Sequence, residues 1–218
     1  MDASFIRTCL LTISSLLIIG EAQQSYSQDN FDPLQSIEKY YADIHPLSDE
    51  DKKKIALEIL LNRLSTNKPN EELGADYLLA QGLLTAAYAE TRGMKGLGDL
   101  KRAREYLIAA SEADPSVLEG YAPAFLARLY CTLPGWPISW GSSKRCKLQL
   151  EDTLEKYQSG FAINFYFGLY KVEEGKVTEA RSLLNTAANA NFPKEKYPHW
   201  YSTLHQQIED VLVTNQKR

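Results

Sequence analysis

The side chains best suited to nucleophilic catalysis or metal binding are few and widely spaced in this sequence. The histidines are His45, His199 and His205, and the last two are six residues apart, which puts them on different sides of a helix. No Cys and His spacing typical of a zinc site occurs, nor the Gly-x-Ser-x-Gly turn of a nucleophilic serine. The pattern predicts no enzyme active site, no metal site and no cofactor.

Phosphate and nucleic acid are also poor candidates as ligands. The glycine-rich stretch GMKGLGD, residues 93–99, lacks the Gly-Lys-Ser/Thr ending of a phosphate loop, and no strand precedes it. The chain has 24 Lys and Arg against 28 Asp and Glu, a formal net charge of −4. Its basic residues are dispersed apart from DKKK at residues 51–54 and the last two residues of the chain. Nucleic-acid binding needs a concentrated positive face, so we expect no nucleic-acid partner.

The first residues have the pattern of a secretory signal peptide. Arg7 precedes an apolar run over residues 9–19, and small residues follow at Ala22, Ser25 and Ser27. The run is shorter than the ~20 residues that a membrane-spanning helix needs. We therefore expect a signal peptide at residues 1–27, cut after Ser27 or alternatively after Ala22. The remaining domain, residues 28–218, would be periplasmic or secreted, without stable membrane insertion.

A short repeat organises the rest of the chain. Three stretches share a glycine, a small residue five positions later, a leucine four positions after that, and a small residue three further on. The second and third copies are 34 residues apart and the first and second are 43 apart, so one unit carries extra residues. The copies are Gly98, Ala103, Leu107, Ala110; Gly141, Cys146, Leu150, Thr153; and Gly175, Ala180, Leu184, Ala187.

A second helical pattern precedes each copy, which predicts that each unit is a hairpin of two antiparallel helices. Phe167 and Gly168 hold this place before the last copy, and Leu126, Ala127 and Tyr130 hold it before the middle one. Small residues allow two antiparallel helices to approach closely, which lets the neighbouring large side chains interdigitate.

This pattern resembles the tetratricopeptide repeat, whose frame is Trp-x2-Leu-Gly-x2-Tyr, then Ala-x3-Phe, then Pro. Pro115, twelve residues after Ala103, fits the terminal proline, whereas Lys171 replaces the tyrosine and Asn164 the first aromatic residue. Leucine stands for phenylalanine in all three copies. The resemblance covers roughly residues 70–190 and implies an all-α fold, an α-solenoid of antiparallel helical hairpins with about three repeats.

The flanking segments predict further helices. Residues 33–44 form a short helix, and Ser48 caps a second helix whose apolar face is expected to carry Ile55, Ile59, Leu60 and Leu64. We interpret these two helices as a degenerate N-terminal pair.

Two more helix signals complete the pattern. Asn70 is expected to cap the next helix. At the other end, Trp200, Leu204, Ile208 and Leu212 have helical spacing. We expect there a C-terminal capping helix, because a stack of repeats would otherwise expose its last apolar face.

The stretch CTLPGWPISWGSSKRC, residues 131–146, interrupts the middle unit. Its prolines cannot continue a helix, and Ser142 or Ser143 can cap the helix that follows. We expect an ordered loop in which Trp136 or Trp140 folds back while the other stays open as a binding anchor. The alternative is a loop that only fills its own hairpin.

The PGWPISWG motif and the overall layout also resemble the T-component proteins associated with tripartite ATP-independent periplasmic transporters. That resemblance implies an all-helical periplasmic protein with a pore or groove for an apolar ligand, assembled with a solute-binding partner.

Two predictions for Cys131 and Cys146 remain open. They are the only cysteines after residue 27, and a disulfide closing about 15 residues would contribute ~3 kcal/mol in an oxidising compartment. The repeat register, however, turns Cys131 toward the groove and Cys146 into the interface between helices, which opposes matched Cβ directions.

The first helix of each hairpin should line a concave groove. The register of the resembling family places seven side chains there, although for Leu79 and Leu169 the favoured interpretation is core. The predicted groove is apolar with one cation, which suits an amphipathic peptide holding an acidic group at Arg128. The groove residues are Leu79, Ala86, Tyr121, Arg128, Phe165, Leu169 and Val172.

Two hypotheses for function follow. The first is an exported scaffold that binds a protein or peptide segment in the groove. The alternative is a carrier of a small apolar molecule, or an accessory component of a periplasmic solute transport system.

Overall fold

Every regular element that the structure describes is a helix. The computed structural model describes residues 31–68 and 73–214, and the predicted all-α class is confirmed across these ranges. The chain divides after residue 31, and the helices belong to the unit Asp32–Arg218. They are α2 (Leu34–Lys39), the π-helical turn η2 (Tyr40–Ile44), α3 (Glu50–Thr66), α4 (Ala75–Glu90), the short 3-10 helix η3 (Gly93–Gly96), α5 (Leu97–Ala113), α6 (Tyr121–Thr132), α7 (Ser143–Lys156), α8 (Phe161–Glu173), α9 (Val177–Ala188) and α10 (Pro198–Thr214).

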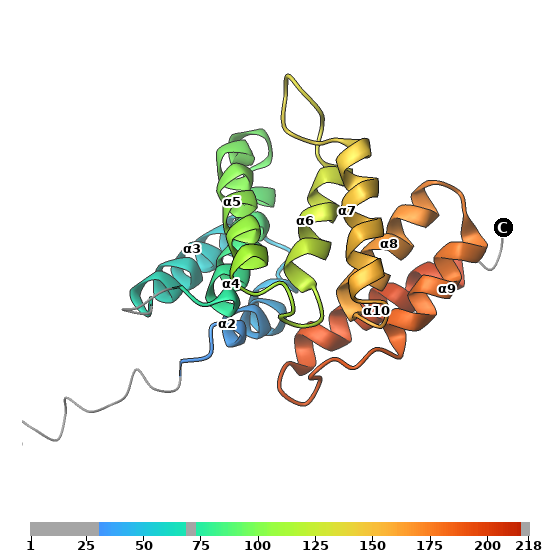
Figure 1. The fold of residues 1–218 in the computed structure, drawn as a ribbon. Helices are drawn as coiled ribbons and strands as arrows, with labels where there is room; N and C mark the ends of the chain where they lie inside the picture. Colours follow the sequence, from blue (N-terminus) through green and yellow to red (C-terminus); the bar gives the residue numbers. More distant parts are fainter. Residues whose placement is uncertain (1–30, 69–72, 215–218) are drawn as a thin grey trace, which may run out of the picture. The chain divides into compact units, whose positions relative to one another are not determined.

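Consecutive helices pack in pairs in the middle of this unit. Helix α4 packs against α5, α6 against α7 and α8 against α9, and the pairs follow one another across the view in Figure 1. The predicted frame lies at these contacts, since its small and leucine positions are all buried. They are Ala103, Leu107 and Ala110; Cys146, Leu150 and Thr153; and Ala180, Leu184 and Ala187.

Close contact within two of the pairs depends on a glycine in the first helix. A Cβ on Gly168 of α8 would lie 2.7 Å from Cγ of Leu184, and one on Gly82 of α4 would lie 2.8 Å from Cγ of Leu107. Ala127, also fully buried, holds the corresponding place in α6. The first unit therefore has the same contact as the last, although the sequence pattern had not included Gly82.

The frame glycines, in contrast, do not share one structural role. Gly175 has a positive φ of 74° between α8 and α9, a conformation that glycine adopts without strain. A Cβ on Gly141 would overlap the carbonyl of Leu133, whereas Gly98 has open space beside it within α5. The repeated glycine thus marks the start of the second helix without a common packing contact.

The predicted N-cap of α3 is wrong, and its predicted apolar face is confirmed for Leu60 and Leu64 but wrong for Ile55 and Ile59. Asp49 is the N-cap in place of Ser48, and its carboxylate accepts from the backbone N–H groups of Asp51 and Lys52, each at 3.1 Å. The exposed side chains Ile55 and Ile59 lie opposite the buried stripe, which is Leu57, Leu60 and Leu64. Apolar residues occupy both faces of this helix, so periodicity alone could not choose the face that packs against α4.

The two N-terminal helices contact different neighbours. Helix α2 packs against α4 and α10, whereas α3 packs against α4 and η2. The predicted cap at Asn70 lies outside the described residues, as does the predicted signal peptide.

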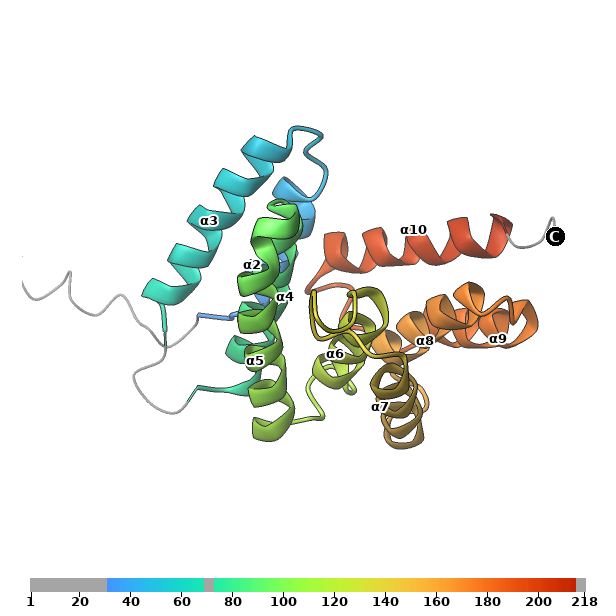
Figure 2. The ribbon, with the colours of Figure 1, turned by 90° about the horizontal axis from the view of Figure 1, so that it is seen from above.

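Helix α10 joins the two ends of the unit. Its N-terminus lies against α2 and η2, and it also packs against α9 (Figure 2). Trp200, Leu204 and Ile208 are buried as the spacing predicts, and Leu212 is half-buried. The helix therefore does more than cover the last pair, because it also connects to the first described helix.

Glu38 of α2 makes this connection specific. Its buried carboxylate accepts the backbone N–H of His199 at 3.0 Å and that of Trp200 at 2.9 Å, and His199 Nδ1 lies 2.6 Å from the same carboxylate. A carboxylate satisfies free N–H groups and complements the dipole at a helix N-terminus. Asp32 adds a second link, with its Oδ2 3.0 Å from the Tyr197 hydroxyl. We call these contacts, together with η2, α10 and the aromatic rings packed around Trp200, the closure.

No helix within residues 31–68 and 73–214 is long and apolar enough to cross a membrane.

Candidate ligand cavity

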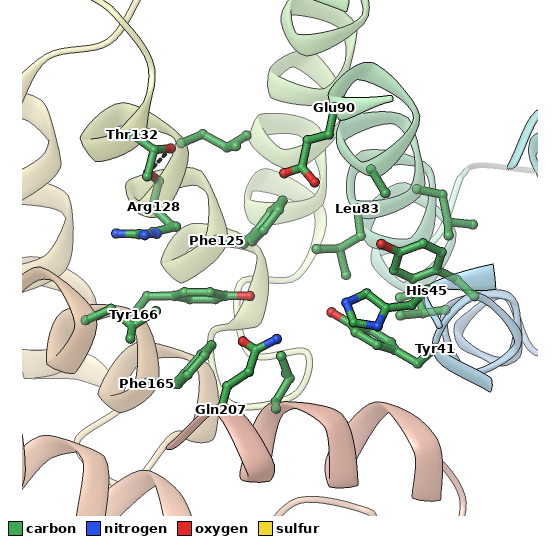
Figure 3. Close-up of a pocket in the computed structure, with 17 residues that line it drawn as sticks. Tyr41, His45, Leu83, Glu90, Phe125, Arg128, Thr132, Phe165, Tyr166 and Gln207 are labelled. Carbon is green, nitrogen blue, oxygen red and sulfur yellow. Dashed lines mark hydrogen bonds between the residues drawn. The ribbon is translucent and has the colours of Figure 1, made fainter. Parts of the chain in front are cut away.

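A cavity of about 330 Å³ lies between α4, α6 and α8 on one side and η2 and α10 on the other (Figure 3). We call it the central cavity. The first helix of each of the three pairs contributes to its wall, and the closure supplies the rest. Its lining residues are Ile37, Tyr40, Tyr41, His45, Leu83, Leu84, Ala87, Glu90, Phe125, Arg128, Leu129, Thr132, Phe165, Tyr166, Leu169, Leu204 and Gln207.

Three of the predicted groove residues line the central cavity. These are Arg128 of α6 and Phe165 and Leu169 of α8. Phe165 is almost fully buried, whereas Leu169 and Arg128 retain part of their surface.

Three other predicted groove residues lie in the core, which for Leu79 confirms the favoured interpretation. Leu79 and Ala86 are buried, and Ala86 packs in a cluster with Ala89, Leu100 and Ala103. Helix α4 is covered by α2, α3 and α5, so only its last two turns reach the cavity. Ala87 lines the wall where Ala86 was predicted, a shift of one residue along the helix.

Tyr121 is the third core residue, and it lies directly behind the cavity wall. Its hydroxyl oxygen is 3.2 Å from that of Tyr166, a lining residue, and it accepts from Trp200 Nε1 at 3.1 Å. Burial raises the pKa of both tyrosines, so their hydroxyls stay protonated at neutral pH. This chain of hydrogen bonds links α10 to the wall formed by α8. Val172, the last predicted groove residue, is half-buried and not part of the lining.

The charged residues of the cavity differ from the predicted single cation. Arg128 Nη1 lies 2.7 Å from Glu173 Oε1, so its charge is already compensated within the protein. Glu90 of α4 is the second charged lining residue, and Figure 3 shows its side chain directed into the cavity between Phe125 and Leu83. Among the described residues no hydrogen bond or ion pair holds the Glu90 carboxylate.

Glu90 is an exposed residue at the end of α4, but the protein around its carboxylate still removes part of the water that would solvate the charge. This desolvation raises the pKa of Glu90 above its ordinary value, and Glu50 adds to the effect while Lys53 opposes it. The pKa of His45, across the cavity, is lowered by burial and by Lys53, which favours the neutral imidazole. Burial also raises the pKa of Tyr40 and Tyr41.

The loop between α6 and α7 separates its two tryptophans. Trp140 folds back, with its ring centroid 5.1 Å from that of Tyr130 and the Arg104 guanidinium 5.2 Å above it. Trp136 at the tip is 90% exposed. Ser142 caps α7, accepting from the Arg145 N–H at 3.3 Å. The loop is thus ordered at its base and presents one indole to solvent.

A disulfide joins Cys131 and Cys146 at the base of this loop. Of the two predictions for this pair, the structure has the bridged one. Their Cα atoms are 5.0 Å apart, well within the range that a disulfide spans. The register argument against the bridge assumed that Cys131 faces the groove, but Cys131 is not a lining residue of the central cavity.

Comparison with protein-family models and with curated protein sequences gives no match for this chain. Within the described ranges, no group of His, Cys, Asp and Glu side chains is placed to hold a metal ion.

The sequence patterns missed the lining residues from outside the repeated frame. Tyr41, His45 and Gln207 come from η2, the turn after it and α10, which had been assigned to the ends of the fold. Glu90 was the exception that a pattern could have found. It is the acidic residue that ends the long apolar run of α4, in the first helix of a predicted hairpin.

Proposed function

We propose that this chain is an exported scaffold whose central cavity binds part of a protein or peptide segment. In this proposal the three helix pairs form a solenoid of antiparallel hairpins resembling tetratricopeptide repeats. The observation that carries the proposal is the shared wall: the first helix of every pair contributes to one cavity, as the concave surface of such a fold requires. The apolar wall suits insertion of one side chain of the segment.

The disulfide supports the exported location. Structural disulfides persist in the periplasm or outside the cell and are rare in a reducing cytosol. N-terminal sequencing of the exported protein tests this, and the expected first residue follows Ser27 or Ala22. An intact residue 1 on the exported protein would contradict a cleaved signal peptide.

Selection from a displayed library of random peptides tests the scaffold proposal. Peptides enriched on the wild-type protein should lose binding to Leu169→Arg, which puts a charged side chain into the cavity wall. Leu148→Arg is the matched control, because Leu148 is an exposed leucine on α7 outside the lining. A library that yields no binder, or binders that ignore Leu169→Arg, would contradict the proposal.

One observation favours the alternative, a carrier of a small apolar molecule or an accessory component of solute transport. The closure covers one side of the wall, and the volume of about 330 Å³ is at the lower end of small-ligand pockets. Native mass spectrometry of freshly purified protein should then show a bound mass that organic extraction removes. Protein of the unliganded mass only would argue against a carrier.

A further inference from the structure

The two charged residues of the central cavity have unequal environments. The Arg128 guanidinium is paired with Glu173, whereas the Glu90 carboxylate faces the cavity without a partner among the described residues. An acidic group on a ligand would have to compete with Glu173 for Arg128. A cationic group would meet Glu90 with no competing ion pair to break.

The other charges near Glu90 do not supply its counterion. Lys53 of α3 acts on Glu90 electrostatically, but its ammonium pairs with Glu50 Oε1 at 2.8 Å. Lys53 lowers the pKa of Glu90 and Glu50 raises it, so the two members of the pair act on Glu90 in opposite directions. Neither Lys53 nor Glu50 is therefore a bound counterion of the Glu90 carboxylate.

Aromatic side chains provide the rest of a cation site. Tyr40, Tyr41, Phe125 and Tyr166 line the same cavity as Glu90, and they come from η2, α6 and α8. Aromatic rings attract cations through their quadrupole, most strongly where water is excluded. The apolar residues around these rings also suit the alkyl stem that carries an ammonium group.

We infer that the central cavity accepts an alkylammonium group, with Glu90 as its counterion and the aromatic side chains around its stem. This inference rests on the proposed function, since it names the chemistry of the ligand that the cavity would hold. The group has two sources, a lysine side chain of a bound segment or a free alkylamine. It replaces the expectation that Arg128 holds an acidic group.

Isothermal titration with three probes of equal chain length tests the charge preference. We expect n-hexylamine to bind the wild-type protein more tightly than n-hexanol or n-hexanoate. Glu90→Gln, which keeps the shape and removes the charge, should weaken hexylamine binding by about tenfold, equivalent to about 1.4 kcal/mol. Glu105→Gln is the matched control, because it removes the same charge from an exposed position on α5 and should leave binding unchanged.

A pair of peptides distinguishes the two sources. One is a binder selected from the displayed library that contains a single lysine, and the other replaces that lysine by norleucine. If the lysine peptide binds through Glu90 while hexylamine does not, the inference holds and the source is a segment. If hexylamine binds through Glu90 and peptides do not, it holds for a free amine and the peptide-scaffold proposal fails.

Two results would overturn the inference. If the norleucine peptide binds as tightly as the lysine peptide, and Glu90→Gln changes neither, the cavity binds peptides without a cation and the proposed function alone survives. If neither hexylamine nor any peptide binds the wild-type protein, both the inference and the scaffold proposal fail. Thermal unfolding of Glu90→Gln verifies that the variant is folded before either conclusion is drawn.

Discussion

Two kinds of contact hold this unit together, the seams within the helix pairs and the closure between its ends. A seam joins helices adjacent in sequence, such as α8 and α9, through small residues and a leucine. The closure joins residues such as Glu38 and Trp200, 162 positions apart, through a carboxylate and a cluster of aromatic rings. The seams build the helix pairs, which pack on one another through α5 with α6 and α6 with α8, and the closure bounds the cavity that the first helices line.

The largest effect is expected where the closure packs most tightly. Trp200 is fully buried, with its ring centroid 4.9 Å from that of Tyr121 and 5.3 Å from that of Phe192. Trp200→Ala should lower the free energy of unfolding by about 3–5 kcal/mol, measured by urea denaturation. Trp136→Ala, at the exposed loop tip, is the control and should change it by no more than about 0.5 kcal/mol. Equal losses for the two variants would show that the closure does not contribute to the stability of the unit.

The disulfide supports the middle seam, where Cys146 takes the place held by Ala103 and Ala180. The double variant Cys131→Ser with Cys146→Ala should lose about 3 kcal/mol, because 15 residues separate the bridged cysteines. Reduction of the wild-type protein should give a similar loss and leave the variant unaffected. Two free thiols in the unfolded, unreduced protein would show that the bridge does not form.

Glu38 tests how much of the closure depends on charge. Glu38→Gln keeps one acceptor oxygen where the carboxylate offers two, so we expect a loss of about 1–2 kcal/mol in unfolding experiments. The control Glu209→Gln lies on α10, where it alters an exposed pair with His205, and it should cost no more than about 0.5 kcal/mol. A loss at Glu38 no greater than at Glu209 would mean that the α10 N-terminus needs no cap from α2.

Glycine-to-alanine substitutions test the seams. Gly168→Ala brings a Cβ against the buried Leu184 side chain, so overpacking of about 1–3 kcal/mol should outweigh the ~1 kcal/mol gain in helix propensity. The control Gly98→Ala meets open space in α5 and should stabilise the protein by about 0.4–1 kcal/mol. Thermal unfolding that ranks the two in the opposite order would contradict close helix contact at Gly168.

The smallest effect is expected at Glu90, and its sign depends on pH. Desolvation raises the pKa of Glu90 in the folded protein, so the ionised carboxylate destabilises the fold at neutral pH and its protonation relieves that cost. Glu90→Gln should therefore stabilise the ligand-free protein at about pH 7. The gain should shrink as the pH falls through the raised pKa toward the ordinary carboxyl value. Urea denaturation at both ends of that interval measures it, and a gain independent of pH would contradict the stated cause.

The seams could be predicted from the sequence and the closure could not. Ala103, Leu107 and their counterparts recur at fixed spacing because the same local contact is made each time. The contact between Glu38 and Trp200 is made once in the unit, so no repeated spacing marks it. Nothing near either residue in the sequence indicates that the other is its partner.

The difference between repeated and single contacts also explains which residues of the central cavity could be predicted. Arg128, Phe165 and Leu169 were found because the repeat register extends over α6 and α8. Helix α4 is covered by three helices, so its apolar run gave no sign of which face remained open. Ala86 was assigned to the groove instead of the core, whereas the core interpretation favoured for Leu79 is confirmed. The position of Glu90, at the acidic end of the apolar run of α4, could have been found by pattern. Its role needed the structure, which shows Arg128 paired with Glu173 and Glu90 without a partner among the described residues.

The bond between Glu38 and the start of α10 sets a limit on how this architecture can grow. Open-ended helical arrays lengthen by duplication, since each new hairpin needs only the one before it. Here an added hairpin would carry α10 away from α2, leave the buried Glu38 carboxylate without its N–H donors and open the cavity to water. We therefore expect relatives of this chain to vary in loop length, as at residues 133–142, while keeping the same number of hairpins.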